Sequence, residues 1–306
     1  MHKPVMLKDV VELLAISNGG TYIDGTLGEG NHAQAILNKI GTNGRLLGVD
    51  WDDQALAIAK GHLSSEMQRC FFEHGNFADL MEIASRREIR SVDGILLDLG
   101  MSSLQVTAAE RGFSFMKSGP LDMRMDRSRK ITAAYLIQTL NFGELTELIW
   151  EFGEERKAKK IASEIVRERK HCTEFTTRWL ADLVIRVKGG RRGRIHPATR
   201  TFQAFRIAVN NELDNLSKGL EESIALLKHR GRLAVLSYHS LEDKVVKEHF
   251  LQHAGQWLSV PEGGKARFVQ DPVIRLVNKK PLEPSRGEIA ENPRARSAKL
   301  RVIERV

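Results

Sequence analysis

The chain has 306 residues, of which 42% are hydrophobic and 28% are charged, values ordinary for a globular protein with a sizeable core. No apolar run approaches the roughly 18 residues of a membrane-spanning helix, and the N-terminal residues lack the apolar core of a signal peptide. The only cysteines, Cys70 and Cys172, lie far apart in the sequence. We therefore expect a cytoplasmic protein with no membrane span, no disulfide framework and no zinc ribbon.

The net charge of +8 is concentrated in the middle of the chain. Residues 108–205 contain 20 Lys and Arg against 12 Asp and Glu, whereas the remainder contains 27 of each class. A basic segment in an otherwise neutral chain favours a polyanionic partner, most simply a nucleic acid. The alternative is a solvated helical surface without a partner.

A glycine-rich turn joins the first predicted strand to a helix. The strand, residues 21–24, is followed by Gly25, Gly28 and Gly30, and residues 31–37 then have helical spacing. Because glycine lets a ligand approach the backbone and a helix N-terminus offers free N–H groups, the turn predicts a nucleotide-like ligand. The spacing is neither G-x-G-x-x-G nor a P-loop. It is typical of S-adenosylmethionine (SAM) enzymes, with a tight turn in an unrelated α/β protein as the alternative.

The second predicted strand, residues 44–50, ends in Asp50. A carboxylate at the end of strand two can accept hydrogen bonds from both hydroxyls of a ribose. Capping of the next helix is the alternative role. Asp52 or Asp53 can provide that cap, which leaves Asp50 available for a ligand.

Two further strands, within residues 70–77 and 91–100, bring Phe77 and Asp98 to the same strand ends. Phe77 could cover an adenine there, with a core aromatic as an equal alternative. The near-continuous apolar run before Asp98 is typical of a parallel strand buried on both faces. Burying a carboxylate without partners is costly, so we expect Asp98 to be functional rather than a structural cap.

The alternation of strands and helices over the first 100 residues predicts a doubly wound parallel sheet. It stops at residues 101–126, which we expect to be a long irregular loop that walls the active site. Helices are then expected at residues 132–140, 142–152, 154–170 and 176–187, and from Pro197 as a favoured first helical residue. The alternation resumes with strands expected at residues 231–238, 273–278 and 299–305.

Long motifs in the chain match one known family. They are Gly25-Thr26 with Gly28-x-Gly30-Asn31-His32, Asp98-Leu99-Gly100-Met101-Ser102-Ser103-x-Gln105, Glu110-Arg111-Gly112-Phe113-Ser114-Phe115, Pro120-Leu121-Asp122-Met123-Arg124-Met125-Asp126, His196-Pro197-Ala198-Thr199-Arg200-Thr201-Phe202-Gln203, Ser237-Tyr238-His239-Ser240-Leu241-Glu242-Asp243 and Asn292-Pro293-Arg294-Ala295-Arg296-Ser297-Ala298-Lys299-Leu300-Arg301. From His2 to its C-terminus the chain resembles the bacterial small-subunit rRNA cytosine-N4 methyltransferase family, called RsmH or MraW.

The resemblance implies a Rossmann-like class I SAM-dependent methyltransferase fold with an inserted all-helical domain. Residues 1–107 and 206–306 would form the SAM-binding methyltransferase domain, and residues 108–205 the basic insert that recognises RNA. The implied activity is SAM-dependent methylation of the exocyclic N4 amine of a cytidine in the decoding centre (P site) of 16S rRNA. The implied partner is 16S rRNA or the small ribosomal subunit.

The family's SAM contacts fall at positions that match Gly30, Asn31, His32, Asp50, Phe77, Asp98 and Gln105. Asn31 departs from the glycine expected between Gly30 and His32. SAM binding should survive this change if Asn31 contributes mainly its backbone.

Cytosine N4 is a poor nucleophile because its lone pair is delocalised into the ring, so alignment with the methyl donor is the largest requirement. Asp98 is the first candidate for orienting N4, although the family assigns it to SAM contact. The sequence after it lacks the prolines and aromatic residue of many amino-methyltransferases, so a flipped base must stack elsewhere. Phe113, Phe115 and Tyr238 are candidates, each with core packing as the alternative.

Further residues are candidates for RNA contact. Arg191, Arg192 and Arg194 lie in a flexible basic loop suited to a phosphate backbone. His239 follows the fifth strand and could contact base or phosphate, with a satisfied structural histidine as the alternative.

No metal is expected. His249 and His253 are four residues apart on a predicted helix, but neither an H-E-x-x-H pattern nor a third ligand accompanies them, so an exposed helix face is expected. Two other classes of function stay open. A Rossmann oxidoreductase is disfavoured by the glycine spacing, and a non-catalytic rRNA-binding assembly factor would need no SAM pocket.

Overall fold

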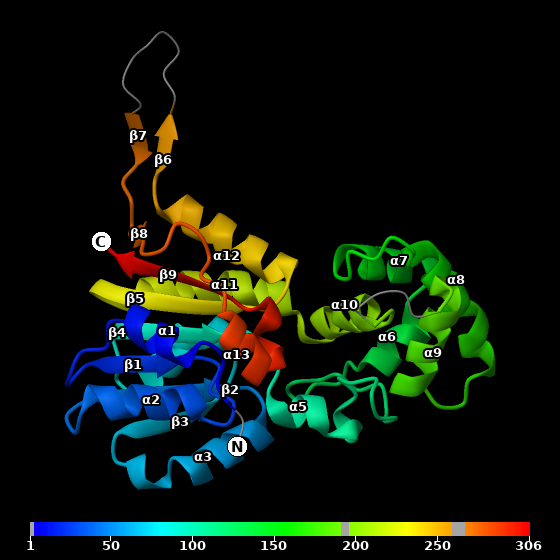
Figure 1. Ribbon diagram of the computed structural model, residues 1–306, viewed down its shortest axis with the longest axis horizontal. Helices are drawn as coiled ribbons and strands as arrows, with labels where there is room; N and C mark the ends of the chain where they lie inside the picture. The colour runs from blue at the N-terminus through cyan, green and yellow to red at the C-terminus, as the bar shows by residue number, and fades with distance from the viewer. Residues whose placement is uncertain (1–2, 191–195, 259–266) are drawn as a thin grey trace. The chain divides into compact units, whose positions relative to one another are not determined.

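The computed structural model describes residues 3–190, 196–258 and 267–306 and forms two compact units (Figure 1). The first unit comprises Met1–Gly100 and Leu213–Val306, and the second comprises Met101–Glu212. From the sequence, we expect the helical insert to begin at residue 108 and to end at residue 205. No helix within the described ranges is long and apolar enough to cross a membrane.

The first unit is built on a seven-stranded sheet with the order β3-β2-β1-β4-β5-β9-β8. Its strands are β1 (Thr21–Asp24), β2 (Arg45–Asp50), β3 (Cys70–His74), β4 (Val92–Asp98), β5 (Leu227–Ser237), β8 (Ile274–Leu276) and β9 (Lys299–Arg305). Strands β1 to β5 run parallel, and β9 pairs antiparallel with both β5 and β8. A separate antiparallel pair joins β6 (Gln256–Leu258) to β7 (Arg267–Gln270).

The helices of this unit are α1 (Leu7–Leu13), α2 (Asn31–Ile40), α3 (Asp53–His62), α4 (Leu80–Arg86), α11 (Glu212–Leu226, whose first residue belongs to the second unit), α12 (Ser240–His253) and α13 (Arg286–Glu291). Short 3₁₀ helices are η1 (Ser64–Glu66), η2 (Phe77–Asp79) and η5 (Pro293–Ser297).

Apolar side chains on both faces of the sheet make two separate cores. Tyr22, Leu46 and Leu96 pack with apolar residues of α1, α2 and α3, whereas the next residues along the same strands, Ile23, Leu47 and Leu97, pack with α4, α11 and α12. Successive strand residues point to opposite faces, so a strand covered on both sides must be apolar throughout. This is the physical reason why the central strands could be recognised in the sequence.

The strand order reverses between β1 and β4. Strands β2 and β3 lie on one side of β1, whereas β4 and β5 lie on its other side. This arrangement confirms the predicted Rossmann-like fold of the class I SAM-dependent methyltransferases. In such sheets ligands bind outside the carboxyl ends of the strands at the point of reversal. The ends of β1, β2 and β4 are therefore where a site is expected.

The second unit is helical, as expected for the insert. It contains α5 (Ser103–Thr107), η3 (Ala109–Arg111), α6 (Ala133–Thr139), α7 (Phe142–Glu151), α8 (Ala158–Glu168), η4 (Arg169–His171), α9 (Thr177–Lys188) and α10 (Thr199–Asn210). Helix α7 packs against α8 and α10, and α9 packs against α8. On α8 the buried residues Ala158, Ile161, Ala162 and Ile165 follow one helical stripe.

Three local predictions were wrong. Residues 101–126 are not wholly irregular, because α5 forms there behind a capping box between Ser102 and Gln105. Helix α8 begins at Ala158 rather than at Glu154, since Glu154 has a positive φ of 47°. Helix α10 begins at Thr199, so Pro197 precedes it instead of occupying its first position.

Candidate functional site

The loop between β1 and α2 is tied to the strands on both sides of β1. The amide of Gly25 donates to the Leu96 carbonyl on β4, and the amide of Leu27 donates to the Val49 carbonyl on β2, each over 2.9 Å. Gly30 then begins α2 as its N-cap with a φ of 82°, a left-handed conformation that glycine adopts without strain. The glycine turn thus connects three strand ends into one rigid edge.

Asp50 is the polar anchor of this edge. One carboxylate oxygen accepts from the Gly28 amide at 2.7 Å, and the other accepts from the Asp52 amide at 2.9 Å. Asp52 caps α3 through the amides of Gln54 and Ala55, as the sequence allowed. The Trp51 amide also bonds to this carboxylate. A carboxylate has about four acceptor sites, so Asp50 can still accept a hydrogen bond from a ligand.

Asp98, the last residue of β4, is held at several points. Its amide donates to Thr26 Oγ1 at 2.6 Å, and its Oδ1 accepts from the Tyr238 hydroxyl at 2.7 Å. Its Oδ2 lies 3.6 Å from His32 Nδ1. The side chain keeps 21% of its surface exposed, so Asp98 is fixed in position yet reachable by a ligand.

His32 is oriented from its other ring nitrogen. Its Nε2 lies 3.0 Å from the Val5 carbonyl oxygen, and because a carbonyl can only accept, that nitrogen carries the proton. In the neutral ring Nδ1 then presents a lone pair toward Asp98. His32 is therefore placed to take up a proton passed on from this carboxylate.

The strand ends concentrate negative charge. Burial raises the pKa of Asp24 to about 7, and the nearby charges of Asp98 and Asp50 add to the shift. Burial also raises the pKa of Asp50 to about 6, against the lowering effect of its backbone hydrogen bonds. In the described part of the chain no Lys or Arg pairs with Asp24 or Asp50. This edge of the sheet is thus suited to a ligand that brings its own positive charge.

Of the other three predicted SAM contacts, Asn31 is the first residue of α2, and Phe77 and Gln105 are packed side chains. Phe77 opens η2 with 9% of its surface exposed. A Cβ atom on Gly219 of α11 would come within 2.4 Å of the Phe77 ring, so Gly219 is what lets this ring lie against the helix. Gln105, in the second unit, is 4% exposed, and its Oε1 accepts from the Ser102 amide at 3.0 Å. Both residues stay predicted SAM contacts.

Tyr238 and His239 lie between β5 and α12 and have structural partners. The Tyr238 hydroxyl is engaged by Asp98, and burial together with the Asp98 charge raises the pKa of Tyr238 well above its ordinary value, so it remains a hydrogen-bond donor. His239 caps α12 in a capping box with Glu242, whose carboxylate also accepts from the Tyr238 amide at 2.7 Å. These contacts favour positioning and capping roles over base stacking.

The aromatic candidates of the second unit differ in exposure. Phe113 is 7% exposed, with the Arg111 guanidinium 5.9 Å from its ring centroid. Phe115 is half-buried and stacks on the His196 ring at 4.2 Å. Of the two, Phe115 is the more accessible to a base. Arg191, Arg192 and Arg194 lie outside the described residues.

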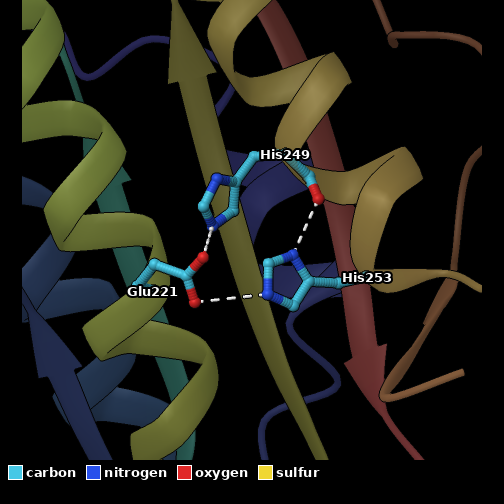
Figure 2. Close-up of side chains that lie close together, drawn as sticks. All are labelled: Glu221, His249 and His253. Atoms are coloured by element: carbon cyan, nitrogen blue, oxygen red, sulfur yellow. Dashed lines mark hydrogen bonds and ion pairs between the residues drawn. The ribbon is translucent and has the colours of Figure 1, made fainter. Parts of the chain in front are cut away.

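The expectation for His249 and His253 was wrong. Neither ring lies on an exposed face: their side chains are 9% and 16% exposed, because α12 packs beside α11 on the sheet. A third potential ligand, Glu221, comes from α11 and faces both rings (Figure 2).

Sequence reasoning assigned no contact to four residues of these clusters: Asp24, Thr26, Glu221 and Glu242. Asp24 had a signal, since it ends a predicted strand directly before the glycine turn. Thr26 and Glu242 lie inside recognised motifs, but their hydrogen bonds could not be read from the sequence. Glu221 had no signal, because nothing in the sequence pairs one helix position with another across two packed helices.

Asp24 should make stability depend on pH. Its folded pKa of about 7 exceeds the ordinary 3.8, so the folded state holds a proton that the unfolded state releases, and stability falls as the pH rises through this range. Asp24→Asn keeps an oxygen for the Thr26 amide and should raise the free energy of unfolding near pH 8 by up to about 4 kcal/mol. Urea unfolding near pH 5 and near pH 8 measures this effect. A variant with an unchanged pH slope would contradict the assignment.

Comparison with known proteins places the chain in a family. The model of the MraW methylase family matches residues 1–306. Proteins named ribosomal RNA small subunit methyltransferase H are similar over the whole chain. The protein from Trichlorobacter lovleyi is 48% identical over 308 residues, and the match covers 100% of this chain and 98% of the relative. The protein from Thermomicrobium roseum is 46% identical over 305 residues, and the match covers 100% of this chain and 94% of the relative. The chain belongs to the MraW methylase family, and it is a SAM-dependent methyltransferase.

Proposed function

We propose that this protein transfers a methyl group from SAM to the N4 amine of a cytidine in the decoding centre (P site) of 16S rRNA, in the cytoplasm. The full-length relatives are named for methylation of small-subunit rRNA. The observation that carries the proposal is Asp98, which Thr26 and Tyr238 hold at the end of β4 beside the glycine turn.

The carboxylates at the strand ends fit SAM as the methyl donor. SAM carries a sulfonium and an ammonium group, and Asp24 and Asp98 offer negative charge that no Lys or Arg of the described ranges neutralises. Asp50 suits the ribose hydroxyls, and the free amides at the start of α2 suit the carboxylate of the amino acid. Gly30, Asn31 and His32 supply that helix start.

Asp98 would orient the target amine. SAM supplies an activated methyl group, so the chain's own residues must hold N4 in line and accept its hydrogen bonds. A carboxylate that accepts from the amine favours a pyramidal nitrogen with an available lone pair. Oδ1 of Asp98 is already occupied by Tyr238, which leaves Oδ2 as the atom facing the substrate.

Methylation of an amine releases one proton. Oδ2 of Asp98 accepts it first in this proposal, and His32 Nδ1, 3.6 Å away, is the next acceptor. The Val5 carbonyl holds the His32 ring in the required tautomer. Tyr238 keeps the carboxylate from turning away during the transfer.

The helical unit would bind the RNA. Arg156, Lys159 and Lys160, in and just before α8, are exposed, and their side chains form no ion pair or hydrogen bond within the described ranges. Unpaired cations on one segment provide the sequence-independent attraction to phosphates that dominates binding to nucleic acid. We also propose RNA contact for Phe115 and, from the sequence alone, for Arg191, Arg192 and Arg194.

Removal of the Asp98 carboxylate should stop the reaction. We expect Asp98→Ala and Asp98→Asn to lower methyl transfer at saturating SAM at least about 100-fold, because both variants lose the carboxylate that accepts the N4 proton. Mass spectrometry of undermodified 16S rRNA after incubation with labelled SAM measures the product. Circular dichroism checks the fold, and calorimetric SAM affinity separates the two roles. Near-wild-type turnover would refute an orienting role, whereas a loss confined to SAM affinity would assign Asp98 to the donor alone.

Tyr238→Phe tests the positioning of Asp98. Losing a hydrogen bond to a charged group should lower turnover about tenfold and leave the fold intact. Tyr22→Phe is the matched control, since its hydroxyl bonds to the Ser17 amide at 2.9 Å on the same unit. Equal activity of both variants in the mass-spectrometric assay would argue against the Asp98 contact.

Neutralising the basic residues should weaken RNA binding. Replacing Arg191, Arg192 and Arg194 by Gln should make the affinity for RNA depend less on salt. The slope of log affinity against log salt concentration should become shallower by about 0.7 to 0.9 for each phosphate that is no longer neutralised. Arg178→Gln is the control, because Asp182 already pairs with Arg178 at 2.9 Å. Filter binding at several salt concentrations measures both, and an unchanged slope would exclude this loop.

A further inference from the structure

Three side chains on two neighbouring helices converge away from the carboxylate cluster. Glu221 comes from α11, and His249 and His253 from α12 (Figure 2). Oε1 of Glu221 lies 3.2 Å from His249 Nε2, and Oε2 lies 3.2 Å from His253 Nε2. One ligand atom from each residue lies within 4.8 Å of the other two.

The ring of His253 is oriented by a backbone hydrogen bond. Its Nδ1 lies 2.9 Å from the His249 carbonyl oxygen, which can only accept, so Nδ1 carries a proton. In the neutral ring Nε2 then has a lone pair directed toward a carboxylate. This is the arrangement of histidines that bind metals, in which the second ring nitrogen donates to a backbone carbonyl.

His249 gives independent evidence. Its side chain is 9% exposed, and its buried Nε2 has no hydrogen-bond partner among the residues that the structure describes, even though Glu221 lies close to it. The carboxylate oxygen is near in distance but lies off the direction in which the nitrogen would donate. A metal ion produces such an offset, because the ion occupies the lone-pair direction and the other ligands lie to its side.

Two protonated rings would be unfavourable here. The rings stack with their centroids 4.6 Å apart. Two positive charges at this separation would repel each other, so the stacked geometry favours the neutral imidazole, which is the form that binds metals.

We propose that Glu221, His249 and His253 form a binding site for a first-row divalent cation, with zinc as the first choice. Two imidazoles and one carboxylate match borderline metals such as zinc, whereas Mg²⁺ and Ca²⁺ prefer oxygen ligands alone. The ion links the C-terminal turn of α12 to α11. Because Tyr238 and His239 precede the opposite end of α12, the site stabilises the helix pair rather than taking part in methyl transfer.

Zinc binding to the full-length, untagged chain tests the proposal. After dialysis against EDTA, calorimetric titration with zinc sulfate should show one tight site per chain, and magnesium chloride should show none. Glu221→Gln and His253→Gln should each weaken zinc affinity at least about tenfold. Zinc should also raise the melting temperature of the wild-type protein, and this increase should disappear in both variants.

Glu248→Gln is the matched control, because Glu248 is an exposed carboxylate on the same helix. It should bind zinc like the wild type. X-ray absorption of the zinc-loaded protein should report two imidazole ligands. Equal zinc affinity in the wild type and in Glu221→Gln would overturn the proposal, as would nitrogen NMR showing His253 protonated on both nitrogens in the presence of equimolar zinc.

Discussion

The candidate site depends on the hydrogen bond from the Gly28 amide to the Asp50 carboxylate. Together with the bond from the Leu27 amide to Val49, it fixes the glycine turn against the end of β2. Thr26, in the middle of the same turn, accepts from the Asp98 amide and so joins the turn to β4. A single loop therefore sets the spacing between the residue proposed for the ribose and the residue proposed for the target amine.

The same edge stores unfavourable electrostatic energy. Asp24, Asp50 and Asp98 lie close enough for the charges of Asp50 and Asp98 to raise the pKa of Asp24. An apolar replacement at Asp24 would remove this repulsion, whereas a cationic ligand removes it only when bound. These buried carboxylates therefore lower the folding stability of the protein. In return, they raise the affinity of the site for a positively charged donor. SAM binding and proton release from Asp24 are expected to be coupled for this reason.

Features that repeat along the chain could be predicted, and features that depend on packing between distant segments could not. The strands ending at Asp50 and Asp98 were recognisable because both of their faces are covered and their residues are apolar throughout. Positions of helix starts were less certain, as α8 shows, because the positive φ of Glu154 is a local choice that propensity does not reveal. The Tyr238–Asp98 hydrogen bond and the approach of Glu221 to His249 each join residues far apart in sequence. Only the fold brings such pairs together.

The helical insert occupies the connection between β4 and β5, which are adjacent, parallel strands. A crossover of this kind needs about a dozen residues, and lengthening it costs little loop entropy when the added segment folds on its own. The insert has internal hydrogen bonds of its own. Arg111 donates to the carbonyls of Arg124 and Met125, and the Asn210 side chain bonds to the backbone of Met123 and Met125 within the same unit. Because the second unit begins at Met101, just beyond Asp98, residues of the insert can change without altering the strands that position Asp98.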